Sequence, residues 1–303
     1  MLRHTLIRTT LRTFRALARP DVPLAAQRAF LDNGGRLMRR PRGLRIELQQ
    51  LAGLPARRLA PRGAHAQRHV LYLHGGGYIQ GSGTSHTPLA AQVAQAARAT
   101  TWLIDYRLAP EHPYPAAVDD ALAAYEALLQ KNIPAAAIAL AGDSAGGGLA
   151  LSTALAIRDT GLPLPAALAL FSPWTDLTLS GASLQTKDAC EPMLNPVWLD
   201  WAAGLYCGEA GDGRVTPRTA PGVSPLFADL AGLPPLLVQV GSDEVLLDDA
   251  TFLAARARRA GVDVTLHEFP GLWHVFQAQA GLLAEADAAL AETGRFLAQH
   301  LPS

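Results

Sequence analysis

Short runs of apolar residues recur along the chain, each long enough for one buried strand. They cover residues 69–74, 101–106, 137–143, 167–173, 235–241 and 264–270. Most are nearly continuous rather than alternating, which is typical of parallel strands buried on both faces. Ala-rich stretches of helical length lie between or after them, at about 88–98, 115–131, 145–159, 248–261 and 282–300. Strand and helix therefore alternate, and the pattern predicts an α/β fold with a mostly parallel central sheet flanked by helices.

The spacing of these runs indicates where the chain departs from a simple strand–helix repeat. Most predicted strands start about 30 residues after the previous one, the length of one strand–helix step. One gap is far longer, and its excess lies within residues 174–234. An insertion at the carboxyl end of a strand lies where ligands bind in such sheets, so it is a natural lid. We therefore expect N-terminal cap helices at 1–60, and a catalytic domain at 61–303 with a cap insertion at about 174–234.

Charge is unevenly distributed although the formal net charge is zero. Residues 1–68 hold 15 Arg and only three acidic residues. The balanced total argues against nucleic-acid binding, which needs a basic face. We expect the basic segment to complement the acidic main body, with a membrane-surface or targeting role as the alternative.

The first residues are expected to form a folded amphipathic helix. Its apolar positions keep helical spacing: Leu2, Leu6, Leu11, Phe14 and Leu17. Interspersed Arg residues exclude the apolar core of a signal peptide, although an Arg-rich, acid-poor segment also fits a mitochondrial transit peptide. No apolar run approaches the roughly 20 residues of a membrane span, so we expect no stable membrane insertion. Two cysteines, Cys190 and Cys207, are read as unpaired thiols, which favours a cytoplasmic location.

The segment Gly142-Asp143-Ser144-Ala145-Gly146 matches G-x-S-x-G. It follows an apolar strand and opens a helix, which is the strand–turn–helix setting of a nucleophile elbow. Flanking glycines allow a tight turn that lifts the Ser144 hydroxyl above the sheet edge. The alternative is an ordinary serine that caps the helix.

Three consecutive glycines, Gly75 to Gly77, follow the first predicted parallel strand and His74. Their backbone N–H groups, together with that of Ala145 after the nucleophile, are suited to hold the negative oxygen of a tetrahedral intermediate. A flexible glycine turn is the simpler alternative. A phosphate-binding loop is disfavoured because the required Lys does not follow.

The elbow motif implies a histidine base later in the chain. His274 alone lies in a loop just past a strand's carboxyl end. His267 lies within a predicted strand, and His300 ends the last helix. A structural loop histidine is the alternative role for His274.

An acid must orient that base, and we expect it in the loop after residues 235–241. Asp243 comes two residues past the strand and is the predicted acid. Asp248 and Asp249 are rivals, but they fall at or inside the next helix. Glu244 is read as a solvated neighbour.

Together these motifs resemble the hormone-sensitive-lipase family of bacterial carboxylesterases. The matching segments are HGGGY (74–78), DYRLAPEHPYPAA (105–117), GDSAGGGLA (142–150), SPWTDL (172–177), GSDEVLLDD (241–249) and WHVF (273–276). The resemblance implies an α/β-hydrolase fold, ester hydrolysis without a cofactor or metal, short to medium acyl chains and a cap built partly from N-terminal helices. It also implies that Gly76 and Gly77 join Ala145 in the oxyanion hole, while His74 braces that loop.

The DYRLAPE segment is interpreted as structural. Asp105, Arg107 and Glu111 are expected to pair with one another and to pin the loop beside the site. One departure from many relatives follows Asp243, where Glu244-Val245-Leu246 replaces a Pro and an Arg.

Substrate choice is expected to depend on Tyr78, Trp174 and Trp198, with Trp174 and Trp198 closing the acyl pocket. The alternative is that the insertion aromatics form only the lid's own core. The expected partner is a small-molecule ester, and a homodimer is possible through a sheet edge at residues 264–269. Within the same chemistry a lactonase or an amidase stays open. A non-catalytic small-molecule receptor is disfavoured, because Ser144, Asp243 and His274 are all in place.

Overall fold

An eight-stranded sheet forms the centre of the computed structural model, which describes residues 2–211 and 213–302. Its strand order is β1-β2-β4-β3-β5-β6-β7-β8, and every pairing from β4 to β8 is parallel. The strands that carry this part are β3 (His69–Leu73), β4 (Thr100–Ile104), β5 (Ile138–Asp143), β6 (Ala167–Phe171), β7 (Leu236–Gly241) and β8 (Val264–Phe269). The predicted α/β fold and each of the predicted strands are confirmed.

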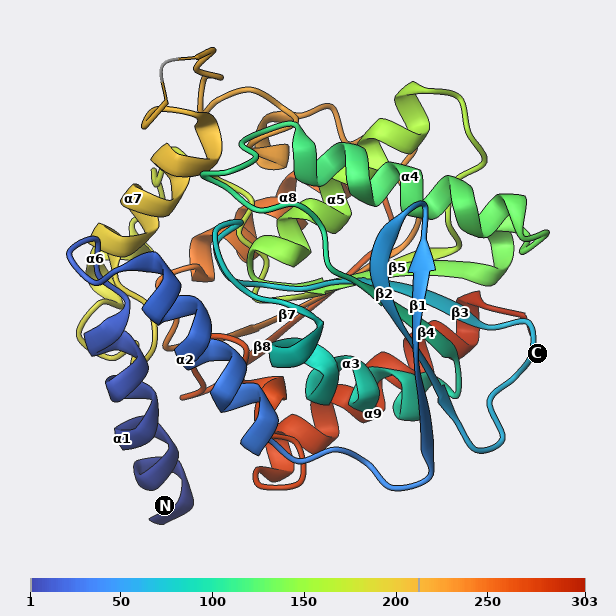
Figure 1. Ribbon diagram of the computed structural model, residues 1–303, viewed down its shortest axis with the longest axis horizontal. Coiled ribbons are helices and arrows are strands. Elements are labelled where there is room, and N and C mark those ends of the chain that lie inside the picture. The colour runs from blue at the N-terminus through green and yellow to red at the C-terminus, as the bar shows by residue number, and fades with distance from the viewer. Residues whose placement is uncertain (1, 212, 303) are drawn as a thin grey trace.

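Helices cover both faces of the sheet (Figure 1). On one face lie α3 (Gly83–Ala97) and α9 (Ala284–His300), which pack against each other. On the other lie α4 (Ala116–Gln130), α5 (Ala145–Asp159) and α8 (Leu247–Arg259). Strands β4 to β7 are buried along their whole length, because each of their faces meets a helix layer. Short 3-10 turns complete the fold at Ala135–Ala137, Pro225–Phe227 and Phe276–Gln279.

Residues 44–61 are strands and not cap helices, which corrects the expectation that the first 60 residues precede the sheet. They form β1 (Leu44–Leu51) and β2 (Leu54–Pro61), an antiparallel hairpin whose second strand pairs with β4. The hairpin turns at Ala52 and Gly53, both at positive φ, as a two-residue turn of this kind requires. Both strands mix polar and apolar residues, so they lack the continuous apolar run of a central strand.

The start of α3 also differs from the prediction. The sequence pattern predicts a start at about Pro88. The helix instead begins at Gly83, because the Ser82 hydroxyl caps it by accepting from the N–H groups of Thr84 and Ser85.

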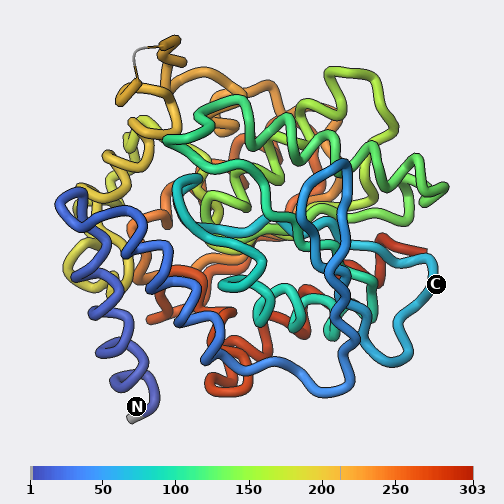
Figure 2. The backbone as a smooth tube through the Cα atoms, viewed as in Figure 1, coloured from blue at the N-terminus to red at the C-terminus, as the bar shows by residue number. Residues whose placement is uncertain are grey.

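Four helices gather beside the carboxyl ends of the parallel strands, and we call them the cap helices. They are α1 (Leu2–Leu17), α2 (Leu24–Leu37), α6 (Ser183–Thr186) and α7 (Pro196–Cys207). The first pair comes from the N-terminus and the second from the insertion, yet they lie together at one side (Figures 1 and 2). Asn195 donates from its side chain to the Ala18 carbonyl at 2.9 Å, which ties α7 to the end of α1. The division of the chain into a cap and a catalytic domain stays a prediction.

Arginines of the basic N-terminal segment bind acidic residues of the main body, as charge complementarity predicts. Arg8 contacts Asp243 at 2.5 Å, and Arg28 binds both carboxylate oxygens of Glu111 at 2.6 and 2.7 Å. The hydrogen bonds from Arg28 hold the pKa of Glu111 down at about 2. Across residues 2–211 and 213–302, none of the helices is long and apolar enough to span a bilayer.

The acidic and basic residues of the DYRLAPE segment do not pair with one another, contrary to expectation. Arg107 binds Asp120 of α4 through hydrogen bonds of 2.7 to 3.0 Å, Glu111 binds Arg28, and Asp105 accepts from the N–H of Gly83. The segment is still pinned, but by partners on α2, α3 and α4 that lie outside the motif.

Replacing Arg107 with Ala is expected to lower the free energy of unfolding by about 2–3 kcal/mol, because the buried Asp120 carboxylate loses its charged partner. Urea denaturation measures the change. Arg45→Ala is the control, since Arg45 is 77% exposed in its pair with Glu47 and should contribute less than about 1 kcal/mol. Equal losses in the two variants would contradict the expectation.

Candidate active site

Ser144 occupies a sharp turn between β5 and α5, so the predicted strand–turn–helix is confirmed. Its backbone has φ 55° and ψ −126°, a strained conformation for a residue with a side chain. The Ser144 N–H donates to the Phe171 carbonyl at 2.8 Å, which locks the turn to the end of β6. Glycine is required at 146, because a Cβ there would collide with the Leu73 carbonyl. The turn therefore fixes the hydroxyl at the carboxyl edge of the sheet.

Asp143, the residue before the elbow, is buried but well partnered. It accepts from the Tyr72 hydroxyl at 2.7 Å and contacts His86 Nε2 at 3.4 Å. Burial raises the pKa of this carboxyl, but the charge and hydrogen bond of His86 together with the hydrogen bond from Tyr72 outweigh that effect, and the net pKa lies below its usual value. A negative charge is thus held beneath the elbow.

The glycine loop after β3 lies directly against Ser144. A Cβ on Gly75 would lie 3.1 Å from the Cβ of Ser144. Gly76 and Gly77 have φ values of 115° and 63°, which aim their N–H groups away from regular structure. Within the described residues, the N–H groups of Gly76, Gly77 and Ala145 donate to no protein acceptor. These free donors next to a serine have the character of an anion-binding site.

His74 braces this loop from behind. Its ring stacks on Tyr106 at 4.2 Å, its Nδ1 contacts the Gly75 carbonyl at 2.8 Å, and the Tyr106 hydroxyl donates to the His74 carbonyl. Burial lowers the pKa of His74 to about 4, so the ring is neutral at physiological pH. A neutral, fully buried histidine fits the bracing role that the resemblance implies.

His274 lies in the loop after β8, with its Nδ1 3.1 Å from Oε2 of Glu244. Both side chains are almost completely buried. Burial alone lowers the pKa of His274, but the hydrogen bond and charge of Glu244, with smaller effects from Glu191 and Asp143, raise it above the usual value. The imidazole is therefore oriented by an acid at Nδ1, which leaves Nε2 for proton transfer.

The acid beside His274 is Glu244 and not Asp243, which corrects the predicted acid. The Asp243 carboxylate, 25% exposed, binds Arg8, while its N–H donates to the Leu272 carbonyl. Glu244 was expected to be solvated but is fully buried. The rivals are also engaged elsewhere: Asp248 accepts from the Ser183 N–H, and Asp249 from the N–H groups of Thr175 and Asp176. Because Asp243 and Glu244 are adjacent in the chain, the sequence alone does not show which of the two carboxylates faces the histidine.

Ser172 connects the elbow to the acid and the base. Its hydroxyl donates to Oε1 of Glu244 at 2.7 Å and accepts from the Val275 N–H at 3.0 Å. The Ser144 N–H donates to the carbonyl of Phe171, the residue just before Ser172. The segment 171–172 therefore holds both the loop of Ser144 and the loop of His274. Ser144, Glu244 and His274 thus follow β5, β7 and β8, whose carboxyl ends meet at one edge of the sheet. Ser172 is the first residue of the SPWTDL motif, but nothing in the sequence pattern indicated that it would bind the acid and the histidine loop.

The predicted substrate-contacting aromatics are all buried, and two of them, Tyr78 and Trp174, lie side by side with their ring centroids 6.1 Å apart. Trp198 packs its ring against Gly77, where an added Cβ would lie 2.6 Å from the ring, and its Nε1 donates to Gln27 of α2 at 2.9 Å. Tyr78 stacks on Tyr206 at 3.8 Å. Trp174 is fully buried, with Nε1 donating to the Asp176 carbonyl.

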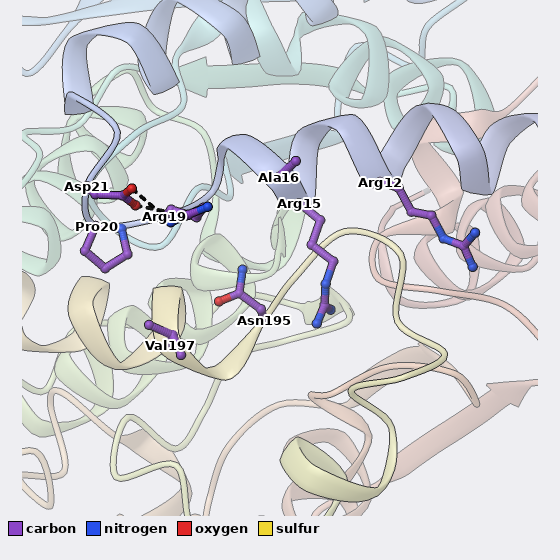
Figure 3. A pocket seen from close by; sticks show the side chains of 8 residues that line it. All are labelled: Arg12, Arg15, Ala16, Arg19, Pro20, Asp21, Asn195 and Val197. Carbon is purple, nitrogen blue, oxygen red and sulfur yellow. Dashed lines mark hydrogen bonds and ion pairs between the residues drawn. The ribbon is translucent and has the colours of Figure 1, made fainter.

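The site is nearly closed to solvent, since Ser144 is only 7% exposed and His274 only 2%. Two surface hollows lie elsewhere. One, of about 570 Å³, lies between α1 and α7 on the outside of the cap and is drawn in Figure 3. The other, of about 500 Å³, lies between α3 and α9. In the described part of the chain, no cluster of His, Cys, Asp and Glu is arranged to hold a metal ion, and Cys190 and Cys207 are unpaired.

Comparison with known proteins places this geometry in a family. The alpha/beta hydrolase fold family matches over residues 70–278. An acetyl-hydrolase of Streptomyces hygroscopicus is 46% identical over 230 residues, which cover 76% of this chain and 75% of that protein. The putative acetyl-hydrolase LipR of Mycobacterium tuberculosis is 37% identical over 302 residues, 99% of this chain and 96% of that protein.

Solved structures agree over the whole chain. An esterase of the bacterial hormone-sensitive lipase family has a TM-score of 0.94 at 39% identity, and the match covers 100% of this chain and 99% of the other. EstE5, in a crystal soaked with p-nitrophenyl butyrate, has a TM-score of 0.92 at 37% identity, with 98% of each chain covered. The elbow, the glycine loop and these relatives together show a carboxylic-ester hydrolase, and the chain belongs to the hormone-sensitive-lipase family of bacterial esterases within the α/β-hydrolase fold.

Proposed function

We propose that this esterase hydrolyses short- to medium-chain acyl esters through an acyl-enzyme on Ser144, with His274 as the base and Glu244 as the acid. The observation that carries the proposal is the buried contact between His274 Nδ1 and Glu244, in a loop network shared with the elbow of Ser144. A serine becomes nucleophilic when an oriented base accepts its proton.

The reaction follows from these positions. Nε2 of His274 takes the proton from Ser144 Oγ as Oγ attacks the ester carbonyl carbon. The N–H groups of Gly76, Gly77 and Ala145 hold the oxygen that becomes negative. The tetrahedral intermediate collapses, the alcohol leaves with the proton from His274, and Ser144 keeps the acyl group. A water molecule, deprotonated by Nε2 of His274, then attacks the acyl carbon. The second tetrahedral intermediate collapses, the carboxylic acid leaves, and His274 returns the proton to Ser144 Oγ.

The relatives support a small acyl group. Two of them are named acetyl-hydrolases, and EstE5 was soaked with a butyryl ester. Trp198 supports the same conclusion, because its rigid ring stands against Gly77 and would shorten the space for a chain. A lactonase or an amidase would use the same groups, and comparison of the three substrate types at equal concentration separates them. The small-molecule receptor is disfavoured by an oriented base beside the elbow.

Location and assembly are further parts of the proposal. A cytoplasmic enzyme fits the two unpaired thiols. A homodimer would form through β8, which lies at one edge of the sheet and exposes much of its length. Light scattering at micromolar concentration tests the dimer, and a strict monomer would remove it without affecting the chemistry.

Ser144→Ala is expected to lower kcat at least about 1,000-fold, because the nucleophile is lost. Wild-type protein mixed with p-nitrophenyl butyrate and quenched early should gain the mass of one butyryl group on the peptide that contains Ser144. Ser180→Ala, an exposed serine of the insertion, is the control and should keep normal activity. A Ser144→Ala enzyme that retains more than about a tenth of the wild-type rate rules the mechanism out.

The two neighbouring acids provide a sharp comparison. Glu244→Gln should lower kcat about 100- to 10,000-fold, since His274 loses the charge that stabilises its protonated form. Asp243→Asn should stay within about tenfold, because that side chain binds Arg8 instead. Both substitutions are isosteric and remove one charge. The reverse ranking would restore Asp243 as the acid.

Chain-length preference tests the role of Trp198. Each added methylene contributes about 0.8 kcal/mol only while apolar wall remains, so kcat/KM should peak at about four to eight acyl carbons. Trp198→Ala should move that peak toward longer chains. Trp174→Ala removes a fully buried ring and should mainly lower stability, by about 3–5 kcal/mol. If palmitoyl esters are the best substrates of the wild type, the short acyl site is disproved.

A further inference from the structure

A second buried carboxyl group, that of Glu191 in the insertion, interacts electrostatically with His274. It lies between α6 and α7 and is 2% exposed. Its Oε1 accepts from the N–H groups of Met193 at 2.7 Å and Leu194 at 3.4 Å. Its Oε2 is buried and has no hydrogen-bond partner among the described residues. Such an orphaned oxygen is unfavourable and rare in native proteins, so it calls for a functional reason.

One guanidinium brings the loop of Glu191 to the loops of the acid and the base. Arg8 Nη1 donates to the Cys190 carbonyl at 2.9 Å. Its Nη2 donates to Oδ2 of Asp243 at 2.5 Å and to the Gly271 carbonyl at 2.8 Å. Glu191 follows Cys190 directly, just as Glu244 follows Asp243. The same arginine therefore holds the neighbours of both carboxyl groups beside the loop that carries His274.

A second arginine of α1 fixes the segment that carries Glu191. Arg15 Nη1 donates to the Glu191 carbonyl at 2.9 Å and also to the Leu194 carbonyl, and Nη2 binds Asp188 at 2.7 Å. Figure 3 shows Arg15 extending from α1 toward the chain near Asn195, while Arg12 points elsewhere. Arg15 thus fixes the chain before and after Glu191, and with it the position of the Glu191 side chain.

The charges around His274 come from three elements of the fold. Glu244 follows β7, Asp143 ends β5, and Glu191 comes from the insertion. Arg8, a cation from α1, packs on the Trp273 ring at 5.1 Å and is already paired with Asp243. Burial raises the pKa of Glu191 to about 7, against the opposing effect of the His274 charge. The group is therefore largely ionised at mildly alkaline pH.

We propose that Glu191 is a positioning residue of the active site: it sets a second carboxylate near the imidazole of His274 and, beside Glu244, stabilises the imidazolium that forms when Ser144 gives up its proton. This inference rests on the proposed mechanism. It gives the cap a direct electrostatic part in the reaction, because α1 holds the carboxylate in position. Because Oε2 has no hydrogen-bond partner among the described residues, the protein neutralises little of the negative charge on this oxygen.

The test is the pH dependence of kcat and kcat/KM for p-nitrophenyl butyrate in Glu191→Gln. Because a nearby negative charge raises the pKa of His274, its removal should move the acid limb of kcat/KM to lower pH, by about half a unit. At pH 9, kcat should fall about three- to tenfold with KM nearly unchanged, since the imidazolium in the transition state loses one favourable charge. Glu191→Asp keeps the charge and should keep the acid limb near its wild-type position.

Asp188→Asn is the matched control: it removes one charge from the same segment at a side chain 42% exposed, and should leave the acid limb in place. A Glu191→Gln enzyme whose rate drops equally at every pH, or does not change, overturns the proposal, as does an equal shift in Asp188→Asn. Glu244→Gln measured alongside separates the two levels. If it is fully active, the proposed mechanism fails; if it is inactive while Glu191→Gln keeps the wild-type profile, only this inference fails.

Discussion

The buried carboxylate of Glu244 joins the ends of three strands. It accepts from the Gly241 N–H at the end of β7, from the Ser172 hydroxyl after β6, and contacts His274 after β8. A carboxylate without solvent is tolerated only when hydrogen bonds and an opposite charge compensate its lost hydration. The positions of these loops are therefore mutually dependent, and Ser144 joins them through Phe171. The geometry of the site is a condition for burying this charge.

The cap helices and the loops of the candidate site are held together by side chains that reach from one to the other. Arg8 and Arg15 project from α1 and donate to backbone carbonyls of the insertion, and Arg8 also reaches the loop of His274. Trp198 and Gln27 join α7 to α2 above the glycine loop. Because guanidinium groups offer several donors in a rigid plane, one side chain can fix several segments at once. The arginines of α1 thus fix the insertion and the loop of His274 relative to the N-terminal helix.

The sequence determined the features that depend on local pattern. Apolar runs, most of them nearly continuous, predicted β3 to β8, and their spacing located the insertion at 174–234. Gly142 to Gly146 predicted the strand–turn–helix around Ser144, since its glycines and following helix are neighbours in the chain. His274 was identified by its place after a strand end. The predictions of the strands and of the elbow succeeded because the carboxyl ends of parallel strands meet at one edge, whatever the details of packing, whereas the role of His274 stays a prediction.

Tertiary structure alone decided which of two adjacent acids faces the histidine. Asp243 and Glu244 differ by one position, and their side chains leave the backbone in different directions, toward Arg8 and toward His274. That direction depends on bonds to the distant Leu272 and Ser172, which no local pattern encodes. The hairpin β1–β2 was missed because both strands mix polar and apolar residues: β1 lies at the edge of the sheet, and β2, between β1 and β4, is only partly buried. Local composition fixes which elements form, whereas the orientation of a single carboxylate is set by contacts between segments far apart in the chain.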